Sequence, residues 1–218
     1  MREMRAFLFD KYHTWYDWRL TLTSKDHPAP EPNFNYIKLE GANGSIDATE
    51  ALTGETTYAD RTVTASFRTS EGTREERDAL LREISAALHG RKVQIIEPDD
   101  PDHFYLGRCK IKPTERSAVH IAFDVEATCD PWRYAVEETE RRVDVLGATD
   151  VVLWNHGQKT LCPEIRVSGN VTVTFGGEPT ALSTGVYKLS HLKLRAGAAV
   201  VSLTGSGTVT FYYREACL

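Results

Sequence analysis

The sequence lacks the features that mark several large classes of protein. It contains no run of 18 or more apolar residues, which excludes a helix that spans a membrane. Its four cysteines, Cys109, Cys129, Cys162 and Cys217, include no CxxC pair, so neither a disulfide framework nor a zinc site is expected. A Walker A loop is missing, as is a Gly-x-Gly-x-x-Gly segment after a strand. We therefore expect free thiols, and neither a metal ion nor a cofactor.

An excess of basic residues is missing as well. The chain of 218 residues has 26 Lys and Arg against 31 Asp and Glu, a net charge of −5. Proteins that bind nucleic acids generally present a basic footprint, so specific DNA or RNA binding is not expected. All of the net charge falls in residues 1–135, whereas residues 136–218 are balanced and richer in Val, Thr, Gly and Leu. This contrast predicts two domains, 1–135 and 136–218.

One segment has strong helical periodicity. Thr73 and Glu76 have the spacing of a capping box, in which each side chain satisfies a backbone N–H of the other residue. Gly90 supplies a left-handed stop after the apolar positions. The pattern predicts a helix over about 74–89 with Leu88 on its buried face. The apolar positions recur at spacings of three and four residues: Leu80, Leu81, Ile84, Ala87 and Leu88.

The other periodic segments are typical of strands. Apolar and polar residues alternate over 62–68, 92–96, 103–111 and 119–127, and a turn at 113–117 predicts a hairpin of 104–112 with 117–128. Pro131 is expected to end the sheet of the first domain. After a charged linker at 137–142, short strands separated by turns predict a β-sandwich. These strands are expected near 141–146, 151–155, 164–168, 170–175, 186–194, 198–204 and 207–214, with a turn at 205–207.

Residues with catalytic chemistry do not form a recognisable motif. His120 and Asp124 are expected on one face of a strand, but no nucleophile elbow accompanies them. The acidic run 97–102 has no EF-hand pattern and is typical of a solvated turn. We therefore expect no enzymatic activity.

Four residues of the second domain offer the groups that a sugar site needs. Trp154 and Tyr187 supply aromatic faces, and Asn155 and His156 supply polar neighbours. Packing of the aromatic rings into the core or its rim is the alternative. The sequence leaves both interpretations open.

A series of short motifs resembles the distal tail (Dit) family of bacteriophages with long non-contractile tails. Within 37–54 lie Gly-Ala-Asn-Gly-Ser-Ile-Asp and Leu-Thr-Gly, and Tyr-Ala-Asp-Arg follows at 58–61. The resemblance continues in Tyr-Asp-Trp-Arg-Leu at 16–20, Tyr-Leu-Gly-Arg at 105–108 and Cys-Asp-Pro-Trp-Arg-Tyr at 129–134. The order and spacing of these motifs carry the likeness across most of the chain.

The resemblance implies a structural protein of the virion. Members of the family form a hexameric ring at the tail tip or baseplate, between the tail tube protein and the tail-tip proteins, with a channel for DNA. A β-sandwich or split-barrel-like domain builds the ring, and a galectin-like sandwich, similar to carbohydrate-binding modules, follows it. Such a protein is made in the host cytoplasm and needs no membrane. The alternative is a carbohydrate-binding adhesin module.

The matching segment has the chemistry of a shaped loop. Gly41 and Gly44 permit left-handed turns, and Asp47 can accept hydrogen bonds from the backbone. Tyr58 and Arg61 belong to the residue types favoured as interface anchors. We therefore expect these five residues at an assembly interface of the first domain.

Overall fold

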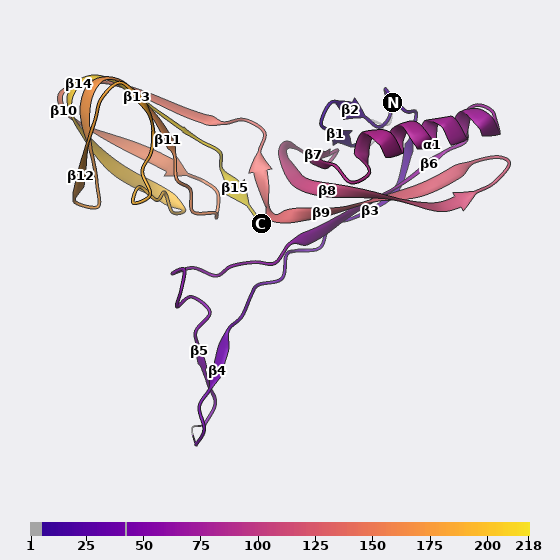
Figure 1. The fold of residues 1–218 in the computed structure, drawn as a ribbon, viewed down its shortest axis with the longest axis horizontal. Helices are drawn as coiled ribbons and strands as arrows, with labels where there is room; N and C mark the ends of the chain where they lie inside the picture. Colours follow the sequence, from indigo (N-terminus) through magenta and orange to yellow (C-terminus); the bar gives the residue numbers. More distant parts are fainter. Residues whose placement is uncertain (1–5, 42) are drawn as a thin grey trace. The chain divides into compact units, whose positions relative to one another are not determined.

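The computed structural model describes residues 6–41 and 43–218, and within them the protein is mainly β with one α-helix (Figure 1). The expected fold class is confirmed in this respect. The chain divides into two compact units, which we call unit 1 and unit 2. Unit 1 ends at Arg133 and also includes Leu218, and unit 2 is Tyr134–Cys217. No helix of the described residues is long and apolar enough to cross a membrane.

Unit 1 is built on a sheet in which the strands follow the order β2-β1-β7-β8-β9-β6-β3. The last two residues of β9 belong to unit 2. A separate two-stranded sheet, β4 with β5, lies between β3 and β6 along the chain. The elements are β1 (Leu8–Phe9), β2 (Tyr12–His13), β3 (Thr21–Asp26), β4 (Tyr36–Lys38), β5 (Ser45–Asp47), β6 (Arg61–Thr69), α1 (Arg74–Leu88), β7 (Lys92–Glu97), β8 (Asp100–Arg116) and β9 (Ile121–Ala135).

The helix α1 begins at the predicted capping box. The Thr73 hydroxyl accepts from the backbone N–H of Glu76, and the Glu76 carboxylate accepts from the backbone N–H of Thr73. Gly90, with φ of 76°, turns the chain after the helix, and its N–H donates to the carbonyl of Cys109 in β8. The predicted helix is therefore confirmed to within one residue at its end.

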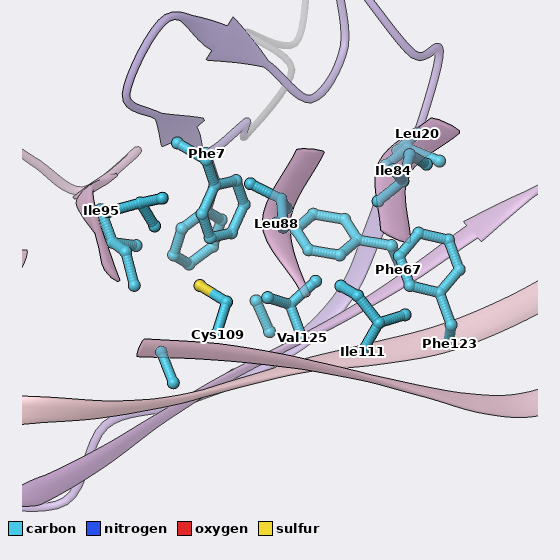
Figure 2. Close-up of a cluster of buried hydrophobic side chains, with 14 of the residues drawn as sticks. Phe7, Leu20, Phe67, Ile84, Leu88, Ile95, Cys109, Ile111, Phe123 and Val125 are labelled. Carbon is cyan, nitrogen blue, oxygen red and sulfur yellow. The ribbon is translucent and has the colours of Figure 1, made fainter. Parts of the chain in front are cut away.

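The apolar face of α1 packs against one face of the unit 1 sheet (Figure 2). Ile84 and Leu88 are fully buried, and an aromatic cluster lies beneath them. In that cluster the ring centroids of Phe7 and Phe67 are 5.9 Å apart, and those of Phe67 and Phe123 are 6.0 Å apart. Burial of several large side chains at about 1.5–3 kcal/mol each makes this core the main stabilising element of unit 1.

All four cysteines are free thiols, as expected. Cys109 and Cys129 are buried in the core of unit 1, where burial raises the pKa of each thiol to about 12. Neither thiol is therefore an activated nucleophile, because the thiolate is the reactive form.

The hairpin of β8 and β9 differs from the predicted one at its turn. The strand was expected to begin at Val119, but β9 begins at Ile121 and Val119 is exposed. The reason is local, since the N–H of Ser117 donates to the carbonyl of His120 and closes the turn there. The predicted alternation of buried residues continues from Ile121 onward along β9.

Pro131 does not end the sheet, which corrects the prediction. β9 continues through it to Ala135. The pairing of β6 with β9 ends at Arg61 and Cys129, so Pro131 lies beyond the last partner on β6. Its missing N–H therefore leaves no carbonyl of β6 unpaired.

Unit 2 is one antiparallel sheet in the order β10-β14-β11-β12, with β13 also paired to β11. Its core is a second cluster of buried aliphatic and aromatic side chains, including Leu153, Ile165 and Phe211. The stretch 137–142 is not a free linker, because residue 139 onward already pairs with β14. The elements are β10 (Thr139–Asn155), β11 (Glu164–Phe175), β12 (Glu178–Leu182), β13 (Gly185–Lys188), β14 (Gly197–Tyr213) and β15 (Ala216–Cys217).

Several of the short strands expected in unit 2 are halves of longer strands. The segments 141–146 and 151–155 are both part of β10, and 198–204 and all but the last residue of 207–214 are part of β14. Gly205 lies opposite Gly147, and both have a left-handed φ, of 124° and 88°. Glycines therefore bend the paired strands without interrupting their register, and residues 205–207 are a bend rather than the predicted hairpin turn.

Truncation of Leu88 tests the packing of α1. We expect Leu88→Ala to lower the free energy of unfolding by about 2–5 kcal/mol, because it removes a buried side chain and leaves a cavity. Leu146→Ala is the control, since Leu146 is 88% exposed and lies outside the arm. Urea denaturation measures both, and equal stability of the two variants would contradict the assigned core.

The opposed pair Gly147 and Gly205 tests the bend in unit 2. A Cβ atom at Gly205 would lie 2.4 Å from the carbonyl oxygen of Asn170, whereas one at Gly147 would have nothing within 4 Å. Gly147→Ala should cost about 1–2 kcal/mol for its left-handed backbone alone. Gly205→Ala should lower the free energy of unfolding by clearly more than that. Thermal unfolding measures both variants, and similar losses would show that the backbone of Asn170 does not approach Gly205 closely.

Candidate assembly surface

Residues 27–60, which we call the arm, connect β3 to β6 and contain the separate sheet of β4 and β5. Ile37 lies opposite Ile46 in this antiparallel pair. Figure 1 shows the pair as a narrow two-stranded ribbon with neither a helix nor a second sheet over its faces. A two-stranded ribbon of this kind has no layer against which it can bury side chains.

Large apolar side chains of the arm are exposed to solvent. Six of them have exposed fractions between 46% and 95%, with Leu52 at the upper end. A concentration of exposed apolar residues of this size marks an interaction surface in a folded protein. The six residues are Phe34, Tyr36, Ile37, Leu39, Ile46 and Leu52.

The arm is also strongly acidic. It contains six acidic residues and one lysine, a net charge of −5, which equals the net charge of the whole chain. The remainder of the protein is therefore balanced. The acidic residues are Glu31, Glu40, Asp47, Glu50, Glu55 and Asp60.

Three of the predicted interface residues shape the hairpin. Gly41 and Gly44 follow β4 and precede β5, and their φ values of 80° and 85° lie in the left-handed region. Asp47 accepts a hydrogen bond from the backbone N–H of Thr49 at 3.0 Å. Hydrogen bonds from the side chain and backbone of Thr49 lower the pKa of Asp47, so its carboxylate is charged at neutral pH. These residues set the path of the arm.

Tyr58 and Arg61 lie where the arm returns to the sheet. The ring of Tyr58 packs edge-on against Trp132, with centroids 5.5 Å apart. Arg61 is only 5% exposed, and its Nη2 donates to the carbonyl oxygens of His27 and Pro28 at 3.0 and 2.7 Å. Arg61 is therefore engaged within its own chain, and its role at an assembly interface stays a prediction.

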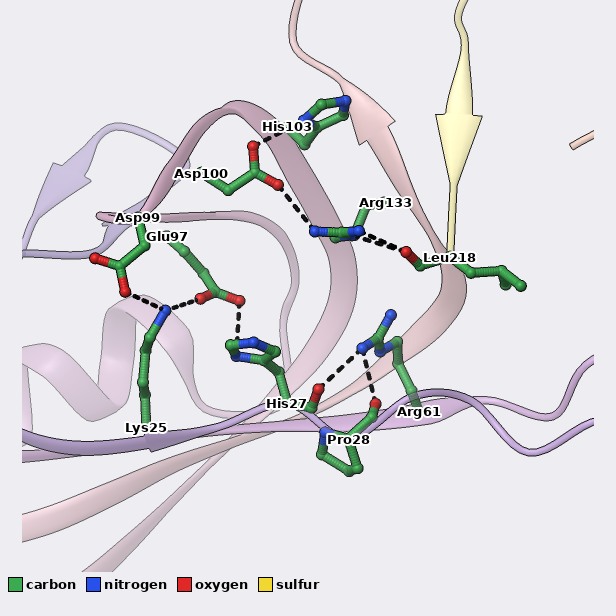
Figure 3. A network of polar contacts seen from close by, with 10 residues as sticks. All are labelled: Lys25, His27, Pro28, Arg61, Glu97, Asp99, Asp100, His103, Arg133 and Leu218. Atoms are coloured by element: carbon green, nitrogen blue, oxygen red, sulfur yellow. Dashed lines mark hydrogen bonds and ion pairs between the residues drawn. The ribbon is translucent and has the colours of Figure 1, made fainter. Parts of the chain in front are cut away.

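A buried carboxylate fastens the root of the arm (Figure 3). Glu97, at the end of β7, is 5% exposed in its side chain and forms an ion pair with Lys25, at the end of β3. Nδ1 of His27 lies 3.2 Å from the other carboxylate oxygen, an ion pair when the ring is protonated. Asp99 adds a second ion pair to Lys25 at 2.9 Å. The strand that leads into the arm is thus tied to β7.

Two residues of this cluster, Lys25 and Tyr105, have raised pKa values and keep their protons at neutral pH. Burial lowers the pKa of Lys25, but its hydrogen bonds with Glu97 and Asp99 outweigh that effect and raise it overall. Burial, and then the charge of Glu97, raises the pKa of Tyr105 to about 12. Lys25 is therefore an ammonium and Tyr105 a neutral phenol at neutral pH. Arg61 stacks over the Tyr105 ring at 4.9 Å and joins both ends of the arm to the same cluster.

Arg133 extends the polar network toward the end of β9. Its guanidinium donates to Asp100 at 3.1 Å and to the carbonyl oxygen of Leu218 (Figure 3). Asp100 also contacts Nδ1 of His103 at 2.8 Å. These contacts hold Leu218 within unit 1.

The four candidate sugar-binding residues differ in their exposure to solvent. Asn155 is 1% exposed, and its side chain is used to bond Gly157, Lys159 and Leu194 of its own unit. Tyr187 packs against the core of unit 2. Trp154 and His156 remain exposed and stacked, with centroids 6.0 Å apart. Asn155 and Tyr187 thus have contacts within their own unit, and sugar binding by these four residues stays a prediction.

The residues considered for catalysis are separated by the structure. His120 contacts Ser117 and Glu115, whereas Asp124 accepts a hydrogen bond from Ser66. The Ser117 hydroxyl accepts from two backbone N–H groups of its turn, which explains its position structurally. Among the described residues no group of three His, Cys, Asp or Glu side chains could hold a metal ion.

Sequence reasoning missed the cluster at the root of the arm and the exposed apolar residues. The signal for the latter was present, since 28–40 combines three prolines with apolar residues that follow no helical or strand period. The partners of Glu97 are distant in sequence, and no local pattern could have named them.

Comparison with known proteins gives a match in structure only. No protein-family description and no curated protein matches the sequence. The crystal structure of SPP1 Dit (gp 19.1), described as a paradigm of the hub adsorption apparatus in phages that infect Gram-positive bacteria, is similar with a TM-score of 0.73 and 15% identity. The match covers 97% of this chain and 99% of that chain. The fold that the Dit resemblance implied is therefore confirmed.

Neutralising Glu97 tests the fastening of the arm. Glu97→Gln should lower the free energy of unfolding by about 1.5–3 kcal/mol, because it weakens hydrogen bonds to a charged partner in a buried place. Asp99→Asn should cost less than about 1 kcal/mol, since Asp99 is half exposed. Urea denaturation at pH 7 measures both. A larger loss of stability for Asp99→Asn than for Glu97→Gln would show that Asp99, and not Glu97, is the principal partner of Lys25.

Proposed function

We propose that this chain is the subunit of a phage tail hub, a ring of six copies at the distal end of the tail tube. It joins the tube protein to tail-tip or baseplate proteins in the virion, after synthesis in the host cytoplasm. The observation that carries the proposal is the shared fold with SPP1 Dit over nearly the whole of both chains. A match of this extent includes both units and is not limited to one common module.

The first domain, residues 1–135, builds the ring in this proposal. It contains the arm, whose apolar residues have nothing to cover them in a single copy. Gly41, Gly44 and Asp47 shape the contact segment, and Tyr58 holds its base. Residues 136–218 lie outside the ring closure in this proposal, because their exposed apolar side chains belong to a five-stranded sheet and not to a separate two-stranded ribbon like that of β4 and β5.

The charge of the protein supports a passive channel. A ring with a net charge of −5 per subunit lacks the excess of Lys and Arg that holds phosphate groups. Genomic DNA would pass through such a ring without specific binding.

The role is structural rather than catalytic. The alternative of a carbohydrate-binding adhesin has less support, because only Trp154 and His156 of the four candidate residues present an exposed face. Assembly, not glycan binding, is therefore the function that the surface supports best.

Removal of apolar side chains from the arm tests the proposal. We expect the wild-type chain to form a closed hexamer at tens of micromolar in sedimentation velocity and native mass spectrometry. Ile37→Ser with Leu52→Ser should shift the protein to monomers, because both side chains would be buried only in the assembly. The midpoint of thermal unfolding of the variant monomer should match that of dilute wild-type monomer.

Val186→Ser is the matched control, since Val186 is 62% exposed but belongs to unit 2. It should leave the hexamer intact. A wild-type chain that stays monomeric at these concentrations would contradict the proposed function. A hexamer lost only with Val186→Ser would contradict the assignment of the ring to the first domain.

A further inference from the structure

Unit 1 contains a groove of about 550 Å³ between α1 and the distal part of β8. Its apolar part is made by Leu81, Ile111 and Pro113. Its rim is mainly basic, because Arg82 and Arg116 face a single acid, Asp78. Ser85 and His89 complete the lining.

The two arginines of the groove are available to a partner. Both side chains are exposed, and within residues 6–41 and 43–218 neither Arg82 nor Arg116 has an ion pair. His89 is engaged, since its Nδ1 accepts from the backbone N–H of Ile111 and so fixes the end of the helix to β8. The groove therefore offers two unpaired positive charges beside a preformed apolar strip.

The arm has the complementary character. It is apolar and carries a net charge of −5, whereas the rest of the chain is neutral. Within it, Glu31 and Glu40 flank the apolar residues of β4 and its approach, with Phe34 and Ile37 between them. The arm thus has acidic residues on both sides of an apolar segment, and the groove has basic residues beside its apolar part. The two surfaces are complementary in charge and in apolar character.

We propose that the arm of one copy seats in the groove between α1 and β8 of the next copy. The proposal rests on the proposed ring and identifies the surface that receives the arm. The groove is lined only by residues between 78 and 116, so the arm of the same chain does not fill it. A partner outside the chain is therefore needed to fill it, and the arm of a second copy has the complementary charge.

This contact is heterologous, because the donating surface and the receiving surface are different parts of the chain. Each copy gives its arm to one neighbour and receives the arm of the other. A heterologous contact repeated with a fixed rotation closes into a ring when that rotation divides a full turn without a rise along the axis. The arm and groove thus account for assembly with a defined direction around the ring.

Charge reversal on both sides of the contact provides the test in the full chain. Arg82→Glu with Arg116→Glu should weaken association at least tenfold at low salt, and so should Glu31→Lys with Glu40→Lys. The variant that combines all four changes should regain most of the affinity, because opposite charges face each other again. Lys193→Glu with Arg195→Glu, two exposed positions in unit 2, is the matched control and should assemble like wild type.

Sedimentation velocity over a range of protein and salt concentrations gives the readout, and thermal unfolding verifies that each variant is folded. Rescue by the fourfold variant supports the contact. A hexamer that tolerates both reversals, or a fourfold variant no better than either pair, overturns the arm–groove contact but leaves the proposed ring standing. A wild-type chain that is monomeric throughout overturns both.

Discussion

A two-stranded ribbon cannot bury the side chains that it carries, and this constraint governs the use of unit 1. The arm places six large apolar residues on β4, β5 and their flanks without a second layer. The exposed surface persists only because the hairpin of β4 and β5 is attached to a well-packed body and does not have to fold on its own. The core beneath α1 supplies this stability, so the arm is free to serve a contact outside its own chain.

Buried charge at the root of the arm fixes where that surface emerges. Glu97 and Arg61 are both nearly inaccessible, and each is bonded to the segment 25–28 that leads into the arm. A buried ion pair adds little net stability over apolar packing, but a buried charge without its partner is costly. Alternative paths for residues 25–28 would leave Glu97 or Arg61 without partners. The cluster therefore selects one starting direction for the arm.

Local signals were sufficient for part of this structure. The capping box at Thr73 and Glu76 predicted the helix, because both of its hydrogen bonds lie within one turn. The same reasoning placed a turn at Gly205, where only the long-range register with Gly147 shows that the strand bends and continues. The sequence predicted Arg61 as an interface anchor, but no sequence pattern could identify its partners within the chain, the carbonyls of His27 and Pro28. Local chemistry was predictable, and pairings across more than thirty residues were not.

The net charge of the chain is concentrated in one segment, a distribution that composition alone conceals. A net charge of −5 suggests mutual repulsion between copies, yet all of it resides in the arm and the bodies are neutral. Close packing of neutral bodies around a ring is not opposed by long-range repulsion. Acidic arms would repel one another if they met, and Arg82 and Arg116 provide a different destination. Repulsion between arms disfavours symmetric arm-to-arm dimers, and attraction to the groove favours the head-to-tail contact that the proposed ring requires.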